Sequence, residues 1–402
     1  MLTVEEARAR LLAQATPLTG VEHVALRDAL GRVLAEAVVS GVAVPPLDAS
    51  QMDGYALRAA DAAQVPAVLP VSQRIAAGQM GTALVAGTAA RIFTGAPLPP
   101  GADAIVMQEA TAPAGEGAVS ITETPRAGQW IRRQGSDIAI GQTVLAAGAR
   151  LHAPHLALAA SVGRATLPVR PRLRVALFST GDELVMPGEP LPPGRIYNSN
   201  RTMLAALLTQ LGCEVQDLGI VPDRLEATRA AFVRASAECD LIVTSGGVSV
   251  GEEDHVKPAV QAEGALDLWQ VAMKPGKPLA FGQVRTVPFI GLPGNPVSSF
   301  VTFLLFARPF ILARQGALVR EQASELQALP LRADFDLPRA DKRREFLRAR
   351  LNGDGGLDLF ANQVSSAMVS VAWADGLIDN PAGRTIARGD TVRFLPLSAL
   401  LT

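Results

Sequence analysis

The chain has 402 residues, too many for one ordinary hydrophobic core, so we expect two to four domains. Its formal net charge of −1 at pH 7 excludes the basic field that nucleic-acid-binding proteins carry. Hydrophobic residues make up 49% of the chain and aromatic residues only 4%, so the cores must consist mainly of Ala, Leu and Val.

Other features of the sequence argue against a secreted or membrane protein. The two cysteines, Cys213 and Cys239, form no CxxC pair, and no Cys/His cluster has the spacing of a zinc site. The N-terminus has no basic-then-apolar leader, and no window approaches the roughly 18 uninterrupted apolar residues of a membrane span. We therefore expect a cytoplasmic protein with two buried, reduced thiols.

The N-terminal region is predicted to contain a helical scaffold. Thr3 and Glu6 fit a capping box, which indicates a helix that continues to about residue 14. A second helix is expected over residues 26–37 and a third over residues 154–163. We assign residues 1–43 and 140–170 to this helical scaffold domain.

Between the two halves of the scaffold, residues 44–139 are expected to form an inserted β domain. They are rich in Gly, Pro, Val and Ala, and they contain strand-sized runs at 71–75, 90–93, 104–107 and 119–122. Three loops of this domain carry unusual residues, at 44–55, 91–106 and 135–138. Taken singly, the loops at 91–106 and 135–138 are explained more simply as structural turns.

Residues 171–317 alternate between strand and helix, which predicts a doubly wound α/β domain with a parallel sheet. Asn200 is a suitable N-cap for the first helix of this domain. Residues 318–402 are expected to form a C-terminal β-barrel with a hairpin at 352–356. In the α/β domain the expected strands are 175–178, 215–221, 241–244 and 288–291, and the expected helices are 201–211, 224–237, 255–262 and 296–310.

Each predicted strand of the α/β domain ends in a loop rich in Gly, Pro, Ser or acidic residues, at 179–183, 222–223, 245–254 and 292–296. Ligands bind outside the carboxyl ends of the strands in such sheets, so we expect these loops to form one site. The loop after residue 244 joins a strand to a helix and is suited to cradle a phosphate. For that loop alone, a Gly-rich surface turn is the alternative, because it contains no Walker A motif.

The residue types in these loops indicate a phosphate-containing substrate and Mg²⁺. Glu183, Asp223 and Asp254 are the expected metal ligands, because Mg²⁺ takes one or two carboxylates besides phosphate and water. Lys274 and Lys277 would contact an oxyanion or a phosphate. The sequence contains no motif with a nucleophile and a histidine, so we expect electrostatic rather than covalent catalysis.

These motifs resemble those of the molybdopterin molybdotransferases of MoeA type, the family that includes the C-terminal part of gephyrin. The C-terminal segment matches more loosely than the rest, through REFLRARL (344–351) and ADGLI (374–378). The other matching stretches, in the order of the family, are PPLDASQMDGYA (45–56), IFTGAPLPPGADAIVMQE (92–109), GSDI (135–138), STGDEL (179–184), GRIYNSN (194–200), TSGGVSVGEEDHVK (244–257), KPGKP (274–278) and GLPGNPVSS (291–299).

The resemblance implies an enzyme that binds adenylated molybdopterin and molybdate, inserts molybdenum into the dithiolene with Mg²⁺, and releases AMP. It also implies an elongated homodimer of four-domain subunits, in which the β domain of one subunit completes the active site of the other. The molybdopterin-adenylating enzyme and factors of molybdoenzyme maturation are further candidate partners. Nucleic acid and membrane are not expected partners.

The resemblance also assigns roles to individual residues of this chain. Asp53, Thr94 and Asp137 would reach the active site of the partner subunit. The expected catalytic residues are Asp53, Asp137, Glu183, Asp223, Asp254, Lys274 and Lys277. The expected substrate-binding residues are Thr94, Ser179, Thr180, Gly181, Ser245, Gly246, Gly247, Ser249, Gly251, Pro293, Gly294 and Pro296.

One segment departs from the expected pattern, and three alternative functions are considered. Residues 363–370 are less polar than a segment facing the site should be, so we assign no function to them.

An enzyme that adenylates molybdopterin with ATP would resemble only the α/β segment, and the other motifs argue against it. A binding scaffold, as in gephyrin, lacks a recognisable peptide groove here. A tungsten-inserting or inactive paralogue is the third alternative, and the site acids argue against lost activity.

Overall fold

A six-stranded sheet forms the centre of the α/β domain, with the strand order β16-β13-β17-β21-β20-β18. The computed structural model describes residues 1–248, 255–318 and 328–401. The strands are β13 (Arg174–Thr180), β16 (Glu214–Val221), β17 (Leu241–Ser245), β18 (Gly264–Gln270), β20 (Pro278–Val284) and β21 (Val287–Leu292).

The prediction of a parallel sheet is correct for four strands and wrong for the other two. β16, β13, β17 and β21 are mutually parallel, whereas β20 and β18 run antiparallel to their neighbours. Only two residues connect β20 to β21, and so short a connection permits only an antiparallel pair. The sequence prediction contained neither β18 nor β20.

Helices cover both faces of this sheet and bury two separate cores. Alternate residues of β13 divide between them, since Leu177 belongs to one core and Phe178 to the other. Phe232 packs edge-on against Phe178, with ring centroids 5.3 Å apart. The helices are α3 (Ser199–Gln210), α6 (Pro296–Thr302) and α7 (Arg308–Arg314) on the first core, and α4 (Leu225–Glu238) and α5 (Val256–Glu263) on the second.

One helical segment of the described residues, Pro296–Arg314, has the length and mean hydropathy (1.6) of a membrane span. It consists of α6, a π-helical turn Phe303–Ala307 and α7. Of its 18-residue apolar window, 89% is buried inside the structure, so the protein core accounts for its apolar surface.

The N-terminal helix α1 (Val4–Ala13) begins at the predicted capping box, but it does not belong to the scaffold by packing. Val4, Ala7 and Leu11 lie in the core that also contains Phe306 of the α/β domain. This contradicts the assignment of the whole segment 1–43 to the scaffold domain. The capping signal is local, whereas the partner of an amphipathic face is decided by the tertiary fold.

The scaffold is less helical than predicted. The expected helix at 26–37 is wrong, because only the 3₁₀ turn Leu26–Asp28 forms there. α2 (Ala153–Ser161) is the α-helix of this domain, and it packs with short strands. These strands are β1 (Glu22–Ala25) with β12 (Thr166–Val169) and β2 (Val38–Val39) with β11 (Thr143–Leu145).

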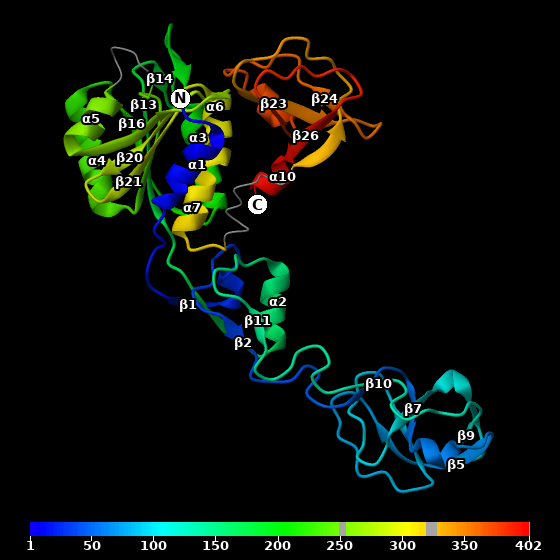
Figure 1. The fold of residues 1–402 in the computed structure, drawn as a ribbon. Coiled ribbons are helices and arrows are strands. Elements are labelled where there is room, and N and C mark those ends of the chain that lie inside the picture. Colours follow the sequence, from blue (N-terminus) through cyan, green and yellow to red (C-terminus); the bar gives the residue numbers. More distant parts are fainter. Residues whose placement is uncertain (249–254, 319–327, 402) are drawn as a thin grey trace.

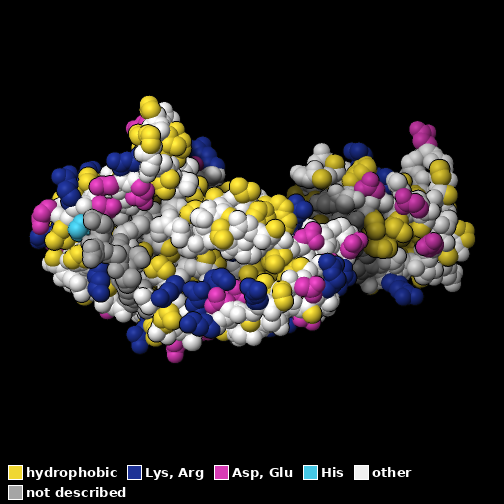
Figure 2. All heavy atoms as spheres, turned by 90° about the horizontal axis from the view of Figure 1, so that it is seen from above, with side chains coloured by type: hydrophobic (Ala, Val, Ile, Leu, Met, Phe, Trp, Pro, Cys, Tyr) yellow, Lys and Arg dark blue, Asp and Glu magenta, His cyan; other side chains and the backbone are white. Residues whose placement is uncertain are grey.

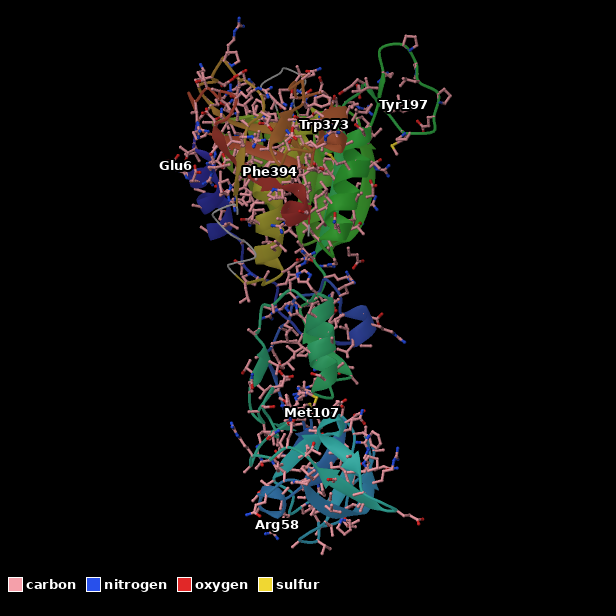
Figure 3. The ribbon with its side chains drawn as sticks, turned by 90° about the vertical axis from the view of Figure 1, so that its right-hand side faces the viewer. Glu6, Arg58, Met107, Tyr197, Trp373 and Phe394 are labelled. Carbon is pink, nitrogen blue, oxygen red and sulfur yellow. The ribbon has the colours of Figure 1, made fainter. Side chains whose placement is uncertain are left out.

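The inserted segment forms the predicted β domain, with a six-stranded sheet in the order β7-β4-β6-β5-β9-β8. Two hydrophobic cores lie within it. Figures 1 and 3 show this domain at the end of the molecule opposite the α/β domain, with the scaffold between them. Its strands are β4 (Gly54–Leu57), β5 (Ala67–Ile75), β6 (Ala89–Ile92), β7 (Ala104–Met107), β8 (Thr111–Pro113) and β9 (Ala118–Ile121), and β3 (Ala49–Ser50) pairs with β10 (Ile131–Arg132).

The C-terminal domain is a curled sheet that includes a strand of the α/β domain. β19 (Met273–Lys274) pairs in parallel with β23, and the predicted hairpin joins β23 to β24. A single bridge, Ala333 to Leu357, links the two ends of the sheet, so closure into a barrel stays a prediction. The strands are β22 (Leu329–Arg332), β23 (Arg344–Leu351), β24 (Leu357–Leu359), β25 (Gly376–Asn380) and β26 (Thr391–Pro396), with helices α9 (Val369–Trp373) and α10 (Leu397–Leu401).

Candidate functional site

A pocket of about 1360 Å³ lies at the carboxyl edge of the parallel strands, where the α/β and C-terminal domains meet. All four predicted loops contribute to it, as the doubly wound topology requires. None of the pocket-lining residues comes from residues 1–170. The predicted site residues that line it are Thr180, Gly181, Glu183, Asp223, Ser245, Gly246, Gly247, Lys274, Lys277, Pro293, Gly294 and Pro296.

The floor of the pocket is the loop after β17, and its conformation requires glycine. Gly246 and Gly247 have φ values of +88° and +64°. A Cβ atom on Gly246 would lie 2.4 Å from the carbonyl oxygen of Thr180. Gly246 already donates its N–H to Leu292, so an anion bound here would use other donors of the loop. A further potential donor lies next to this loop, at the end of β13: the Thr180 hydroxyl is buried without a hydrogen-bond partner.

One described residue among the predicted site residues of these strands and loops, Ser179, does not line the pocket. Ser179 is fully buried, and its hydroxyl lies 3.0 Å from that of Ser245. Ser179 therefore lies behind the pocket wall, and its predicted role in substrate binding stays a prediction. Ser249 and Gly251 lie outside the described residues, as does Asp254.

Carboxylates gather at one side of the pocket. Asp182 and Asp223 exchange hydrogen bonds, with Asp182 N donating to Asp223 (3.1 Å) and Asp223 N donating to Asp182 (3.2 Å). Burial raises the pKa of Asp223, and the neighbouring charges of Asp182 and Glu183 raise it further. Along the described part of the chain, no lysine or arginine forms a salt bridge with Glu183 or Asp223.

This arrangement suits a divalent cation. Glu183 and Asp223 are hard oxygen ligands in one pocket, and their mutual repulsion would be offset by Mg²⁺. Glu183 and Asp223 line the same pocket and are close enough for the charge of Glu183 to raise the pKa of Asp223. Residues 1–248, 255–318 and 328–401 contain no group of three such side chains that could hold a metal ion, so the predicted three-ligand site stays a prediction. Asp254 would have to supply the third.

The two predicted oxyanion contacts have different surroundings. Lys274 lies in the pocket wall, but its Nζ is 3.0 Å from Glu345 and 3.3 Å from Asp341, both from the C-terminal domain. Burial lowers the pKa of Lys274, and these two ion pairs outweigh that effect and raise it. Lys277 is exposed in the pocket and forms no salt bridge within the described ranges. Its positive charge is therefore available to a ligand.

The C-terminal domain supplies a wall that the sequence prediction missed. Residues 361–366 and Met368 line the pocket, so the decision to assign no function to residues 363–370 is wrong for that part of the segment. Gln363 fixes the loop through two hydrogen bonds of 3.0 Å to the backbone of Arg348. The N–H of Val297, in α6, donates to Ser365 at 3.0 Å. No local signal marks this wall, because it depends on how two domains pack.

A second missed wall comes from the segment between β13 and α3. Ile196, Tyr197, Asn198 and Asn200 line the pocket. The Asn200 side chain donates to Gly294 at 2.7 Å and so joins two pocket loops. The predicted N-cap of α3, Asn200, is wrong by two residues, since Asn198 accepts the hydrogen bond from Arg201. The motif GRIYNSN was a signal for this wall.

The remaining predicted site residues lie in the distant β domain. Asp53 accepts hydrogen bonds from the N–H and the hydroxyl of Thr94, both at 2.8 Å, and these hold the pKa of Asp53 below its ordinary value. Asp137 is exposed and lies 3.7 Å from Arg132. None of them lines the pocket of its own chain.

Three segments of the chain match known families in order. Residues 2–163 match the MoeA N-terminal region (domain I and II), residues 176–313 a probable molybdopterin binding domain, and residues 330–397 the MoeA C-terminal region (domain IV). Together these matches span all the regions that carry predicted site residues.

Curated proteins and solved structures match the whole chain. The molybdopterin molybdenumtransferase of Haemophilus influenzae is 37% identical over 100% of both chains. Molybdopterin molybdenumtransferase 2 of Mycobacterium tuberculosis is 40% identical over 93% of both chains. A crystal structure of the molybdopterin biosynthesis MoeA protein of Pyrococcus horikoshii has a TM-score of 0.81 and 30% identity, covering 98% of this chain and 99% of that one.

Proposed function

Because the chain belongs to the molybdopterin molybdenumtransferase family, whose members are enzymes of molybdenum cofactor biosynthesis, we propose that it inserts molybdenum into adenylated molybdopterin. The substrates are adenylated molybdopterin and molybdate, and the products are molybdenum cofactor and AMP. The reaction uses Mg²⁺. The observation that carries the proposal is the pocket of about 1360 Å³, in which carboxylates, an available lysine and a glycine loop face one space.

The size and the lining of the pocket support this substrate. Pockets for drug-sized ligands occupy roughly 300–1,000 Å³, so a larger one suits a nucleotide joined to a second ring system. The Gly246–Gly247 loop and the Thr180 hydroxyl are suited to phosphate oxygens. Lys277 supplies the positive charge that molybdate, a dianion, requires beside a phosphorylated substrate.

Each group of residues has a definite task in the proposed reaction. Glu183 and Asp223, with Asp254, would hold Mg²⁺, which offsets the charge of the phosphate oxygens when it is bound. In the step that releases AMP, a water oxygen bonds to phosphorus as the phosphoanhydride P–O bond breaks, the water gives up its proton to solvent, and the leaving phosphate oxygen carries the negative charge. Lys277 and the glycine loop stabilise that charge electrostatically, so no covalent enzyme intermediate is needed.

The proposal includes a homodimer with shared active sites. Asp53, Thr94 and Asp137 lie in the β domain, at the far end of the molecule from the pocket of the same chain (Figure 3). A second subunit could bring its β domain to this pocket. Asp53 suits such a role, because Thr94 keeps its carboxylate ionised and fixed at an exposed position.

The direct test is AMP release from adenylated molybdopterin, measured on purified protein with Mg²⁺, with and without molybdate. We expect release that depends on molybdate, and a loss of at least about a hundredfold in Asp223→Asn and in Asp53→Ala. Glu116→Gln, at an exposed acid of the same β domain as Asp53, is the control and should behave as wild type. Protein that binds the substrate but releases no AMP, with either molybdate or tungstate, would contradict the proposal and favour a binding scaffold.

A further inference from the structure

Three exposed hydrophobic side chains line the pocket, and we call them the pocket mouth. Ile196 and Tyr197 come from β15 (Ile196–Tyr197) and are 55% and 43% exposed, and Val364 of the C-terminal domain is 50% exposed. All three line the pocket. Single exposed hydrophobic residues are ordinary, but three that line one pocket from two domains indicate a binding surface.

The pocket mouth differs chemically from the pocket floor. Besides the glycine loop of the floor, the polar lining contains hydroxyl groups, carboxylates and Lys277. A ligand that fits both parts has an anionic end and a flat apolar or aromatic end. Small-molecule sites have this division in general, with apolar walls and a few polar groups that fix the orientation of the ligand.

The segment that carries Ile196 and Tyr197 is fixed in place although it projects from the domain. β14 (Leu184–Val185) pairs with β15, and Asn198 N donates to Val185 at 2.9 Å. The Tyr197 hydroxyl donates to the carbonyl oxygen of Glu189 at 3.0 Å, which holds its ring. Figure 3 labels Tyr197 on this projecting loop, and Figure 2 shows hydrophobic side chains along a projection from the body.

Val364, which lines the pocket from the C-terminal domain, is also held by hydrogen bonds. Its N–H donates to the Asn362 side chain at 3.1 Å, and its carbonyl oxygen accepts from Arg348 at 3.3 Å. The next residue, Ser365, accepts the N–H of Val297. The apolar groups are therefore positioned before a ligand arrives, which reduces the entropy cost of binding.

We propose that Ile196, Tyr197 and Val364 form a subsite for the planar heteroaromatic ring of a ligand whose phosphate lies on the pocket floor. The inference rests on the proposed function, which supplies two such rings, a pterin and an adenine. An aromatic ring gains contact area against Ile196 and Val364 and stacks on Tyr197. The subsite thus selects substrates by ring, while the floor selects them by charge.

The test compares ring-bearing with ringless phosphates. Binding of AMP, neopterin monophosphate and ribose 5-phosphate is measured by calorimetry for wild type and for the double variant Ile196→Ser/Val364→Ser. We expect Kd for at least one ring-bearing probe to rise about tenfold, and Kd for ribose 5-phosphate to stay within about twofold. Leu191→Ser is the matched control, because Leu191 is 48% exposed on the same projection but does not line the pocket.

Each outcome decides the inference. If only AMP binds more weakly to the double variant, the pocket mouth holds the adenine ring. If only neopterin monophosphate binds more weakly, the pocket mouth holds the pterin ring. Four results would overturn the inference. The double variant could bind all three probes equally more weakly, or bind none of them more weakly. Leu191→Ser could show the same loss of binding, or wild type could bind the ring-bearing probes no better than ribose 5-phosphate.

The AMP-release assay separates this inference from the proposed function. If wild type releases no AMP but the double variant loses ring binding, the proposed function fails and the ring subsite stands. If AMP release depends on molybdate but ring binding is unchanged in the double variant, the subsite fails and the proposed function stands.

Discussion

Asp223 is the residue whose surroundings most clearly distinguish a site from a surface. Its carboxylate lies beside Asp182 and Glu183, and no lysine or arginine in the described part of the chain forms a salt bridge with it. Burial and these two neighbours raise its pKa, so the folded state holds its proton more tightly than the unfolded state does. A group of this kind costs stability once it is ionised, and that cost is typical of sites arranged for a ligand rather than for folding.

The substitution Asp223→Asn should therefore stabilise the metal-free protein at neutral pH. With a raised folded-state pKa, the unfavourable contribution of Asp223 grows as pH rises from about 4, where an ordinary aspartate ionises, through its folded-state pKa. The variant should melt at a higher temperature than wild type at pH 7, with a smaller difference at pH 4. Thermal melts in EDTA measure this, and Glu116→Gln is expected to show no such pattern. A variant less stable than wild type at pH 7 would contradict the account.

At the scale of elements, the short strand β19 decides the role of Lys274. β19 belongs to the α/β domain but pairs with β23, so Lys274 sits beside Glu345 at the domain boundary. Glu345 is only 3% exposed, and one of its carboxylate oxygens is buried without a partner. Lys274 therefore joins the two domains that form the pocket, whereas Lys277, three residues later, faces the ligand.

We predict that the two lysine variants differ in kind. Lys274→Ala should lower the free energy of unfolding by about 2 kcal/mol, because it leaves the buried Glu345 carboxylate without its cation. Lys277→Ala should leave stability within about 0.5 kcal/mol and raise KM for molybdate at least about tenfold. Denaturant unfolding and AMP-release kinetics measure these effects. Equal losses of stability in the two variants would contradict the division of roles.

At the scale of the whole molecule, the elongated shape separates residues that the proposed reaction needs together. The scaffold holds the β domain away from the α/β domain, as Figures 1 and 3 show. Asp53 and Thr94 therefore cannot be explained by the pocket of their own chain. A closed dimer would bring each β domain to the pocket of the other subunit, with the same contacts made twice.

Mixing two inactive variants tests this arrangement. If the sites are shared, Asp53→Ala and Asp223→Asn are each inactive, but a mixed dimer contains one site with both residues intact. Random reassembly of equal amounts should then restore about one quarter of wild-type AMP release, because half of the dimers are mixed and each has one working site. Differently tagged subunits confirm that mixed dimers form. Mixed dimers without activity would exclude shared sites.

The sequence by itself determined the elements and loops whose signals are local. Apolar runs marked β13, β16, β17 and β21, and the strand–helix alternation placed their loops at one edge of a sheet. The four loops do converge on one pocket, with Glu183 and Asp223 both in it. The order of the sequence motifs also identified the family, which the comparisons confirm.

Only the tertiary structure decided what depends on contacts between distant segments. No local pattern in the sequence marks four features of the structure. They are the wall around Val364, the ion pair of Lys274 with Glu345, the packing of α1 on the α/β domain, and the burial of Ser179 behind the pocket wall. The antiparallel pair β18 and β20 also left no local signal, because the sequence pattern between the predicted strands was interpreted as strand–helix alternation. Side-chain periodicity specifies which face of an element is buried, but not which neighbour covers it, because that choice is made by packing across the whole chain.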